Sequence, residues 1–176
     1  SEDAINIINS NFVIKNGFID NIASDAIDVD NGEGNLSNLK ILNIKNDAID
    51  LSESNAKISN IYFNNIGDKA ISAGENSDIT IQDIEIEKSY LGLVSKDGSK
   101  VKATNITARN VSIPFAAYIK KNEYKYPELH VLNTNHLNYK ILYAKDKQSK
   151  LSINKASKKK ITTNIIDKIY NPEDKI

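Results

Sequence analysis

The feature that most constrains this chain is a repeat with a period of 22 residues. Segments of similar character begin at Asp3, Asp25, Asp47, Lys69 and Leu91, each 22 residues after the one before. A unit this short cannot bury its own apolar face, so several units must stack to close a common core. The period therefore predicts a solenoid.

Apolar and polar residues alternate over short runs within each unit. Ile27 and Val29 alternate with Asp28 and Asp30, and an Ile-rich second run follows at residues 36–44. Alternation at period two indicates half-buried strands, and the Asn residues scattered through every unit disfavour helix interiors. We expect an all-β protein, a right-handed parallel β-helix with coils of about 22 residues and about six or seven coils.

Two columns of mostly Asn residues recur in phase with the apolar runs. The first column contains Asn16, Asn38, Asn60, Asp83 and Asn105, and the second contains Asn21, Asn43, Asn65, Lys88 and Asn110. Asn tolerates the left-handed backbone conformation that sharp corners need. Stacked amides can also bond to one another, so we expect inward-facing Asn ladders along the stack.

Several segments resemble a known type of repeat. Ala-Ile-Ser-Ala-Gly-Glu at 70–75 and Gly-Leu-Val-Ser-Lys-Asp-Gly-Ser at 92–99 are similar to right-handed parallel β-helix repeats of bacterial surface and polysaccharide-associated proteins. The similarity is greatest to the repeats found beside CotH-like kinase domains, and it covers about residues 3–133. The resemblance implies the fold. It leaves the activity open, because that superfamily contains enzymes, adhesins and inert stalks.

The repeat also suggests how the chain is divided. We expect the β-helix over residues 1–157 and a C-terminal cap or tail over 158–176. The chain begins in the middle of the pattern, which indicates a fragment of a longer protein. Pro114 predicts a break, after which Phe115 resumes the short strand two residues late. There is no Cys and no apolar stretch long enough to span a membrane.

A net charge of zero hides an uneven distribution. Residues 1–88 contain 6 Lys or Arg and 16 Asp or Glu, whereas residues 89–176 contain 17 and 7. The asymmetry is compatible with ordinary solvated surface, with an anionic ligand near the basic end, or with head-to-tail self-association of copies.

The acidic residues of the opening strands form the first candidate site. Asp28, Asp30 and Asp50 should point outward and stack on neighbouring coils. Close carboxylates repel one another unless something compensates them, and an oxygen-only donor set would suit calcium. The alternative is an exposed acidic face with no cofactor.

A cluster of Tyr and Lys residues forms the second candidate site, a glycan-binding surface made of Tyr118, Lys120, Lys121, Tyr124, Lys125 and Tyr126. Aromatic rings stack on sugars, and ammonium groups attract anions. The partner we expect is a polysaccharide or cell-surface glycan. Nucleic acid is not expected, because the cluster has no Arg and no recognisable binding motif. The alternative is that the Tyr rings only pack a loop against the solenoid.

Candidate catalytic residues are scarce. Arg109 is the single arginine, and His130 and His136 have no third ligand that would complete a zinc site. We assign no catalytic residue. The sequence favours a non-catalytic extracellular or cell-surface module, serving as a stalk, an adhesin or a glycan-binding surface, with the periplasm as another location. The alternatives are a self-assembling structural subunit of a surface layer or filament, and a polysaccharide lyase or epimerase.

Overall fold

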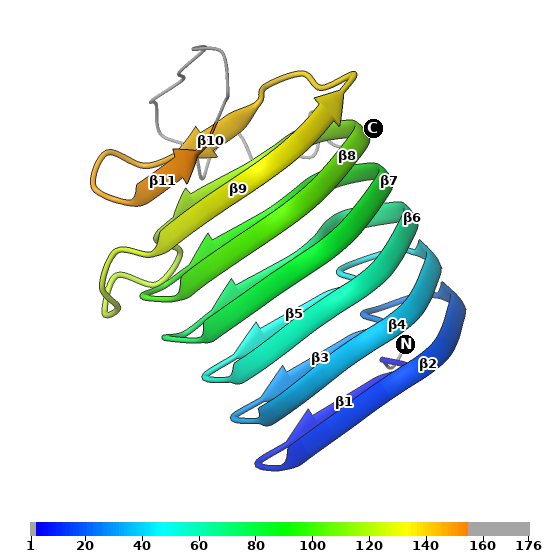
Figure 1. Cartoon of the computed structure of the whole chain (residues 1–176). Helices are drawn as coiled ribbons and strands as arrows, with labels where there is room; N and C mark the ends of the chain where they lie inside the picture. Colours follow the sequence, from blue (N-terminus) through cyan, green and yellow to red (C-terminus); the bar gives the residue numbers. More distant parts are fainter. Residues whose placement is uncertain (1–2, 155–176) are drawn as a thin grey trace.

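The chain folds as a parallel β-solenoid of about seven turns (Figure 1), which confirms the predicted fold class. The computed structural model describes residues 3–154. The strands are β1 (Ile5–Ile8), β2 (Asn11–Ile22), β3 (Ile27–Asp30), β4 (Glu33–Ile44), β5 (Ile49–Ser52), β6 (Asn55–Gly74), β7 (Asp78–Lys96), β8 (Lys100–Tyr118), β9 (Glu128–Leu137), β10 (Tyr143–Lys145) and β11 (Lys150–Ile153). The described residues contain no helix long and apolar enough to cross a membrane.

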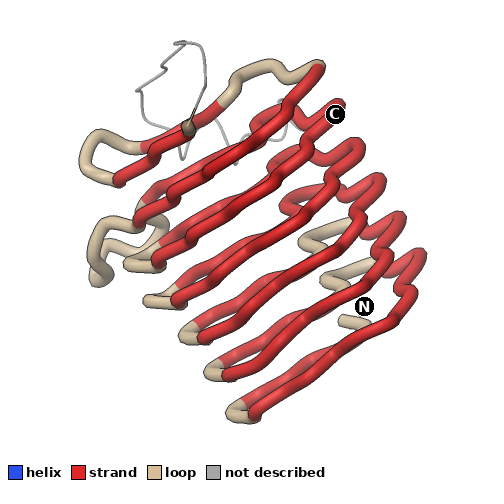
Figure 2. The backbone as a smooth tube through the Cα atoms, viewed as in Figure 1, coloured by secondary structure: helices blue, strands red, loops and turns tan. Residues whose placement is uncertain are grey.

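Register between coils follows the period read from the sequence. Ile27 on β3 lies opposite Ile49 on β5, and Ile49 lies opposite Ile71 on β6. In each turn a short strand is followed by a corner and a longer, bent strand (Figure 2). The short strands stack into what we call the front wall, made of β1, β3, β5, the C-terminal ends of β6, β7 and β8, and β10.

The core is a vertical pile of branched aliphatic side chains. Ile27, Ile49, Ile71, Leu93 and Phe115 lie one above another on the inner side of the front wall, and each is at most 1% exposed. Full burial of a side chain of this size contributes about 1.5–3 kcal/mol relative to leaving it exposed. Each coil is therefore stable only when its neighbours cover it.

The Asn columns form ladders at the corners, as predicted. Asn38 has a φ of 55°, and its Nδ2 donates to Asn16 Oδ1 over 3.1 Å. Asn60 Nδ2 donates in turn to Asn38 Oδ1 over 2.7 Å. The prediction that these amides face inward is wrong, because Asn38 and Asn60 are both exposed. The left-handed corner turns Asn38 outward and lets the next residue, Leu39, point into the core.

Pro114 does not break the stack, contrary to the sequence prediction. Phe115 lies opposite Leu93, 22 residues earlier, so the strand resumes without delay. Ile113 and Phe115 both have register partners, whereas Pro114 occupies the intervening position opposite Gly92, which forms no pair. The N–H that proline lacks is therefore not needed there. Gly92 suits this position, because a Cβ on it would lie 2.3 Å from the Pro114 carbonyl oxygen.

The largest interruption of the period is an insertion between β8 and β9. Lys100 on β8 pairs with Glu128 on β9, 28 residues later, because the loop at 119–127 folds out from the front-wall corner (Figure 1, between β8 and β9). The loop is anchored by Asp97, whose Oδ1 accepts hydrogen bonds from the backbone N–H groups of Lys120 and Lys121 over 2.6 and 2.8 Å. β10 and β11 then begin a seventh coil. The cap or tail predicted for 158–176 lies outside the described residues.

Candidate functional site

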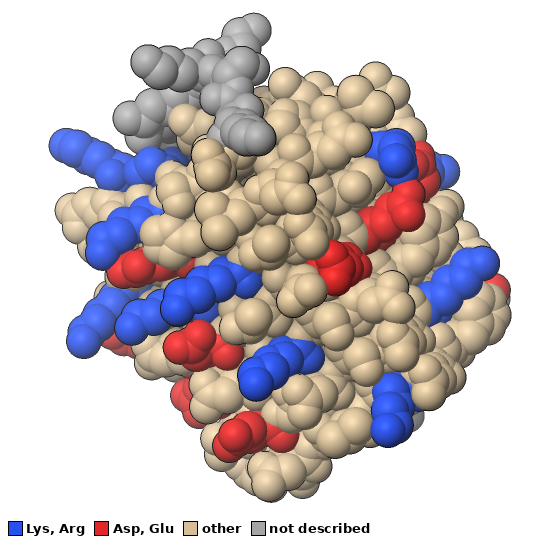
Figure 3. All heavy atoms as spheres, viewed as in Figure 1, with Lys and Arg blue, Asp and Glu red and all other residues tan. Residues whose placement is uncertain are grey.

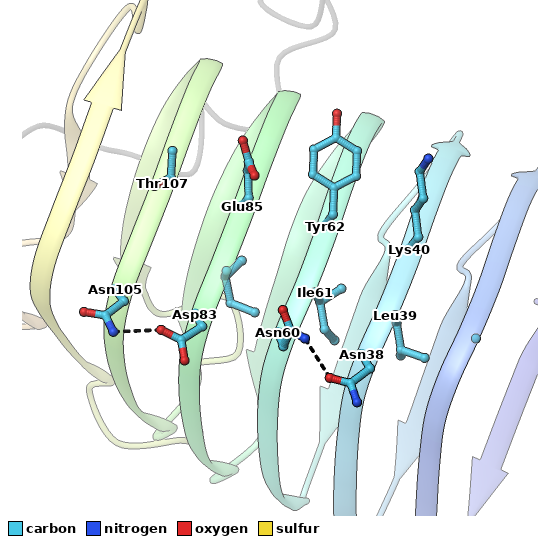
Figure 4. A pocket seen from close by; sticks show the side chains of 12 residues that line it. Asn38, Leu39, Lys40, Asn60, Ile61, Tyr62, Asp83, Glu85, Asn105 and Thr107 are labelled. Atoms are coloured by element: carbon cyan, nitrogen blue, oxygen red, sulfur yellow. Dashed lines mark hydrogen bonds between the residues drawn. The ribbon is translucent and has the colours of Figure 1, made fainter.

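A shallow groove runs along the first Asn ladder across five coils, from β2 to β8 (Figure 4). We call it the ladder groove. Its hollow has a volume of about 520 Å³. The residues that line it are the ladder residues Asn38, Asn60, Asp83 and Asn105, the aliphatic residues Leu39, Ile61 and Ile84, and the outward-facing residues Lys40, Tyr62, Glu85 and Thr107, with Gly17 at one end.

An aromatic–cation–aromatic row follows one side of the ladder groove. Phe18, Lys40 and Tyr62 are register partners on successive coils, and Phe18 is 62% exposed. Lys40 Nζ lies 6.0 Å from the centroids of both rings, a cation–π distance. This row was not among the sites predicted from the sequence. The row could have been predicted from the repeat, because each of its members follows a ladder Asn by two residues.

Polar groups along the ladder groove offer both donors and acceptors. Asn105 Nδ2 donates to Asp83 Oδ1 over 2.7 Å, repeating the contact between Asn60 and Asn38. Such a bond uses one of an amide's two N–H groups and part of the capacity of its oxygen, so hydrogen-bonding capacity remains at each coil. Glu85 forms an ion pair with Arg109, so acidic and basic groups are balanced along the groove.

The outer face of the front wall holds the predicted acidic residues. Asp28 lies opposite Asp50, as expected, and Asp30 lies opposite Ser52. Burial, together with the carboxylates of Asp30 and Asp50, raises the pKa of Asp28 to about 6. Asp50 Oδ1 lies 3.7 Å from the Nζ of Lys96, two coils further on. A lysine and the raised pKa of Asp28 thus relieve the expected repulsion.

The described structure forms no cluster of metal ligands around these carboxylates. Within residues 3–154 no group of three or more His, Cys, Asp or Glu side chains is placed to hold a metal ion. Asp50 faces Lys96 instead, and Asp30 is exposed at the end of its strand. Calcium binding at Asp28, Asp30 and Asp50 therefore stays a prediction from the sequence.

A buried ionic cluster, which was not predicted from the sequence, lies beside these residues. Lys69 Nζ is 3.2 Å from Asp47 Oδ1 and 2.7 Å from Asp68 Oδ2, and all three residues are buried. The backbone N–H of Lys69 also donates to Asp47 Oδ1 over 3.0 Å. Burial raises the pKa of Asp47 to about 7, and the Lys69 ammonium opposes this shift. The sequence feature that could have predicted this cluster is Lys69, which replaces Asp in the column of Asp25 and Asp47.

The six residues of the predicted Tyr and Lys surface do not form one continuous surface in the structure. Tyr118 is fully buried on the front wall and cannot take part in a surface. Lys121 Nζ lies 2.5 Å from Glu75 Oε1, so its charge is already paired. Tyr124 and Lys121 line a separate hollow of about 370 Å³ with Asp30, Asn31, Glu53 and Glu75. The other predicted members, Lys120, Lys125 and Tyr126, are exposed on the loop.

The remaining candidate residues are engaged by neighbouring side chains. Arg109 pairs with Glu85. His130 Nδ1 lies 2.7 Å from Ser152 Oγ, and the ring of His136 packs against Tyr139 with a centroid distance of 5.3 Å. Arg109 and His136 are thus held by neighbouring side chains. His130 lies between the hydroxyl of Ser152 and the carboxylate of Glu128, whose Oε2 is 3.4 Å from His130 Nε2.

Comparison with protein family models, with curated proteins and with solved structures finds no match, so the site must be interpreted from its geometry.

Proposed function

We propose that the protein is a non-catalytic, extracellular solenoid module that binds an extended, uncharged glycan in the ladder groove. The observation that carries the proposal is the continuity of this groove, which crosses five coils and presents the amides of Asn38, Asn60 and Asn105 along the stack, with the ring of Tyr62 beside them. A linear polymer matches such a surface better than a compact small molecule. The extracellular location rests on the resemblance of the repeats to those of bacterial surface proteins.

The chemistry of the ladder groove favours sugars over other polymers. A nucleic acid would need clustered basic side chains for its phosphates, whereas the ladder groove is lined by one lysine, Lys40, and two carboxylates, Asp83 and Glu85. A peptide that added as a strand would need an open sheet edge, and the strands beneath the groove are already paired on both sides. Hydroxyl groups, which both donate and accept, match the spare capacity of the ladder amides.

The side chains beside the ladder groove are held in place before any ligand binds, which would favour glycan binding. Tyr62 is held by Lys40 above its ring and by Asn64, whose Nδ2 donates to the Tyr62 hydroxyl over 2.8 Å. Phe18 and Tyr62 stand two coils apart with Lys40 between them, so both rings offer a face or an edge to the same polymer. Because these side chains are already positioned, little conformational entropy is lost when a ligand binds.

A glycan array followed by isothermal titration calorimetry with the full chain tests the proposal. Tyr62→Ala should weaken binding of any glycan found by about tenfold, which corresponds to about 1.4 kcal/mol. Tyr124→Ala, in the separate hollow at the front-wall corner, is the matched control and should leave the affinity unchanged. Circular dichroism of both variants checks that they fold.

Two results would contradict the proposal. If no neutral glycan binds, the ladder groove is not a glycan site. If Tyr124→Ala abolishes binding and Tyr62→Ala does not, the ligand sits at the loop and the ladder groove is only a surface feature.

A further inference from the structure

We propose that the Nζ of Lys69 and the side-chain carboxyl of Asp47 join in an intramolecular amide bond, with Asp68 carrying the proton that the reaction moves. The bond is a covalent cross-link between two neighbouring coils, and the folded chain makes it without a cofactor or a second protein. The proposal concerns the buried ionic cluster described above and is separate from glycan binding in the ladder groove.

The three side chains are buried, although charged groups normally stay in contact with water. Lys, Arg, Asp and Glu side chains stand out on the face of the molecule in Figure 3. Asp47, Asp68 and Lys69 are instead 3%, 5% and 4% exposed. Such surroundings make ions costly and favour a neutral carboxyl and a neutral amine, the two forms that can react with each other. Burial raises the pKa of Asp47 to about 7, so its carboxyl holds a proton in many molecules near neutral pH.

The reacting atoms lie close to one another. Lys69 Nζ is 3.2 Å from Asp47 Oδ1 and 3.2 Å from Asp47 Oδ2. A nitrogen equidistant from both oxygens of a carboxyl is also near the carbon between them, close to the separation of about 3–3.5 Å that precedes bond formation. The fold thus turns an encounter between two groups into a step within one molecule. Burial also keeps bulk water away from the bond once it has formed.

The repeat fixes the orientation of the Asp47 carboxyl. Asp3, Asp25 and Asp47 each accept, through Oδ1, the backbone N–H of the residue one coil later in the same column, over 3.0, 2.8 and 3.0 Å. In the last of these bonds the donor is Lys69, whose side chain begins beside the carboxyl that it attacks. The same N–H stabilises negative charge on Oδ1 during the attack, as a donor of an oxyanion hole does.

Asp68 is placed to move protons. Its Oδ2 lies 2.7 Å from Lys69 Nζ, closer than either oxygen of Asp47. A proton first passes from Nζ to Asp47 Oδ2, which leaves a neutral amine and a neutral carboxyl. As Nζ bonds to Asp47 Cγ, Asp68 Oδ2 takes a second proton from the nitrogen. Asp68 returns this proton to Asp47 Oδ2, and the bond between Cγ and Oδ2 breaks to release one water molecule.

The amide leaves the net charge of the cluster unchanged, because one positive and one negative charge disappear together while Asp68 keeps its own. It closes a loop between residues that are 22 positions apart. A covalent link of this kind lowers the conformational entropy of the unfolded chain, as a disulfide does. The chain contains no cysteine, so a disulfide cannot serve this purpose.

Intact-mass spectrometry of the full chain tests the proposal, because the reaction removes one water molecule. The denatured wild type should be lighter than its sequence by the mass of one water, and fragmentation of a proteolytic digest should show Asp47 joined to Lys69. Lys69→Arg keeps a positive charge in the cluster but has no reactive amine, so it should have the full sequence mass. A folded wild type that keeps the full sequence mass after prolonged incubation would overturn the proposal, whatever the variants do.

A second pair of measurements separates the amide from another source of water loss. Asp97 precedes Gly98, and such a pair can lose water by forming a succinimide. Mild alkali reopens a succinimide but not an amide, and a succinimide would persist in Lys69→Arg. Water loss that persists in this variant would therefore contradict the proposal.

The role of Asp68 is tested by the rate. Asp68→Ala leaves both reacting groups in place but removes the group that carries the proton. In protein made by cell-free translation and sampled over time, the variant should lose water at least about a hundredfold more slowly than the wild type. Circular dichroism checks that it folds. An equal rate in a folded Asp68→Ala variant would contradict the proton transfer through Asp68.

Discussion

The outward-facing side chains of the front wall differ in polarity between its two ends, whereas the inward-facing side chains are apolar at both. One outward row contains, in register, Asn6, Asp28, Asp50, Ser72, Val94, Ala116 and Ala144, so it changes from polar to apolar along the stack. The inner row is apolar throughout. Stacking therefore restricts the inner side chains of every coil, whereas the outer side chains are free to take different chemistry in different coils.

Different forces hold the two outer regions together. In the early coils Asp28 and Asp50 are partly exposed, and Lys96 reaches back to Asp50. In the later coils Val94 and Ala116 belong to a second buried apolar cluster together with Tyr90, Leu91, Ile113, Tyr118 and Ala144. The same wall thus carries a hydrated acidic surface at one end and a second hydrophobic layer at the other.

Exchanging a polar and an apolar side chain between the two outer regions should have the largest effect on the free energy of unfolding. Val94→Asp puts a carboxylate among the apolar residues of the second cluster, where Val94 is 1% exposed, and should cost more than about 4 kcal/mol in the free energy of unfolding. Asp28→Val, in the same row but partly exposed, should change it by less than about 1 kcal/mol. Urea unfolding followed by circular dichroism measures both. Similar costs for the two variants would show that the outer regions do not differ in burial.

Truncation on the inner side should give nearly equal losses at both ends. Ile49→Ala and Leu93→Ala each remove a fully buried branched side chain and leave a cavity, so each should cost about 2–5 kcal/mol. We expect the two values to agree within about 1 kcal/mol, because both residues are stacked between buried apolar neighbours, Ile27 and Ile71 for Ile49, and Ile71 and Phe115 for Leu93. The same urea titrations measure them, and a much smaller loss at one end would mean that the core is not continuous.

A column of serines inside the front-wall corner offers a sharper test. Ser54 Oγ accepts the backbone N–H of Gly32 over 3.0 Å, and Ser77 Oγ accepts that of Ser54 over 3.0 Å. The series stops at Pro127, which has no N–H to give to the next serine, and the Oγ of Ser149 has no hydrogen-bond partner.

Ser77→Ala should therefore cost about 1–3 kcal/mol, because it leaves a buried N–H unsatisfied. Ser149→Ala removes a hydroxyl that satisfies nothing and should cost less than about 0.5 kcal/mol. Thermal and urea unfolding of the two variants, compared side by side, measure the difference. An equal loss in both would show that the serine column contributes packing rather than hydrogen bonds.

The sequence was sufficient for the fold because stacking imposes one period on every inner position. Ile27, Ile49 and Ile71 could be placed on top of one another from spacing alone, and so could the corners at Asn16 and Asn38. The direction of the corner side chains could not, because it depends on which neighbour of the left-handed residue turns inward. The insertion at 119–127 hid the true register of the last coils.

The candidate sites were harder to predict, because outer positions follow no shared rule. Lys96 and Lys121 neutralise carboxylates on other coils, Asp50 and Glu75, and the period does not show how far a lysine side chain reaches. Tyr118 looked like a surface residue because it precedes a polar loop, yet the second apolar cluster buries it. The ladder groove arises from side chains that each look ordinary within a single unit.

The smallest expected effect is the pH dependence of the acidic region. The pKa of Asp28 is raised to about 6 in the folded state, through burial and the carboxylates of Asp3, Asp25, Asp30 and Asp50. Its unfolded value is near 3.9, so between these values the native state binds more protons, and the free energy of unfolding falls as pH rises from 4 to 7. The contribution is present in full below the unfolded pKa and is lost as pH passes the folded one.

Asp28→Asn removes this titration, so the fall in the free energy of unfolding between pH 4 and pH 7 should be smaller than in the wild type. Because the side chain is partly exposed, solvent screening limits the difference to less than about 1 kcal/mol. Urea unfolding at one-unit intervals measures it, and Ala at position 28 should behave as Asn does. An unchanged slope in both variants would mean that the early coils of the front wall are as well solvated as an isolated carboxylate. The contrast with the buried cluster around Val94 would then rest on hydrophobic packing alone.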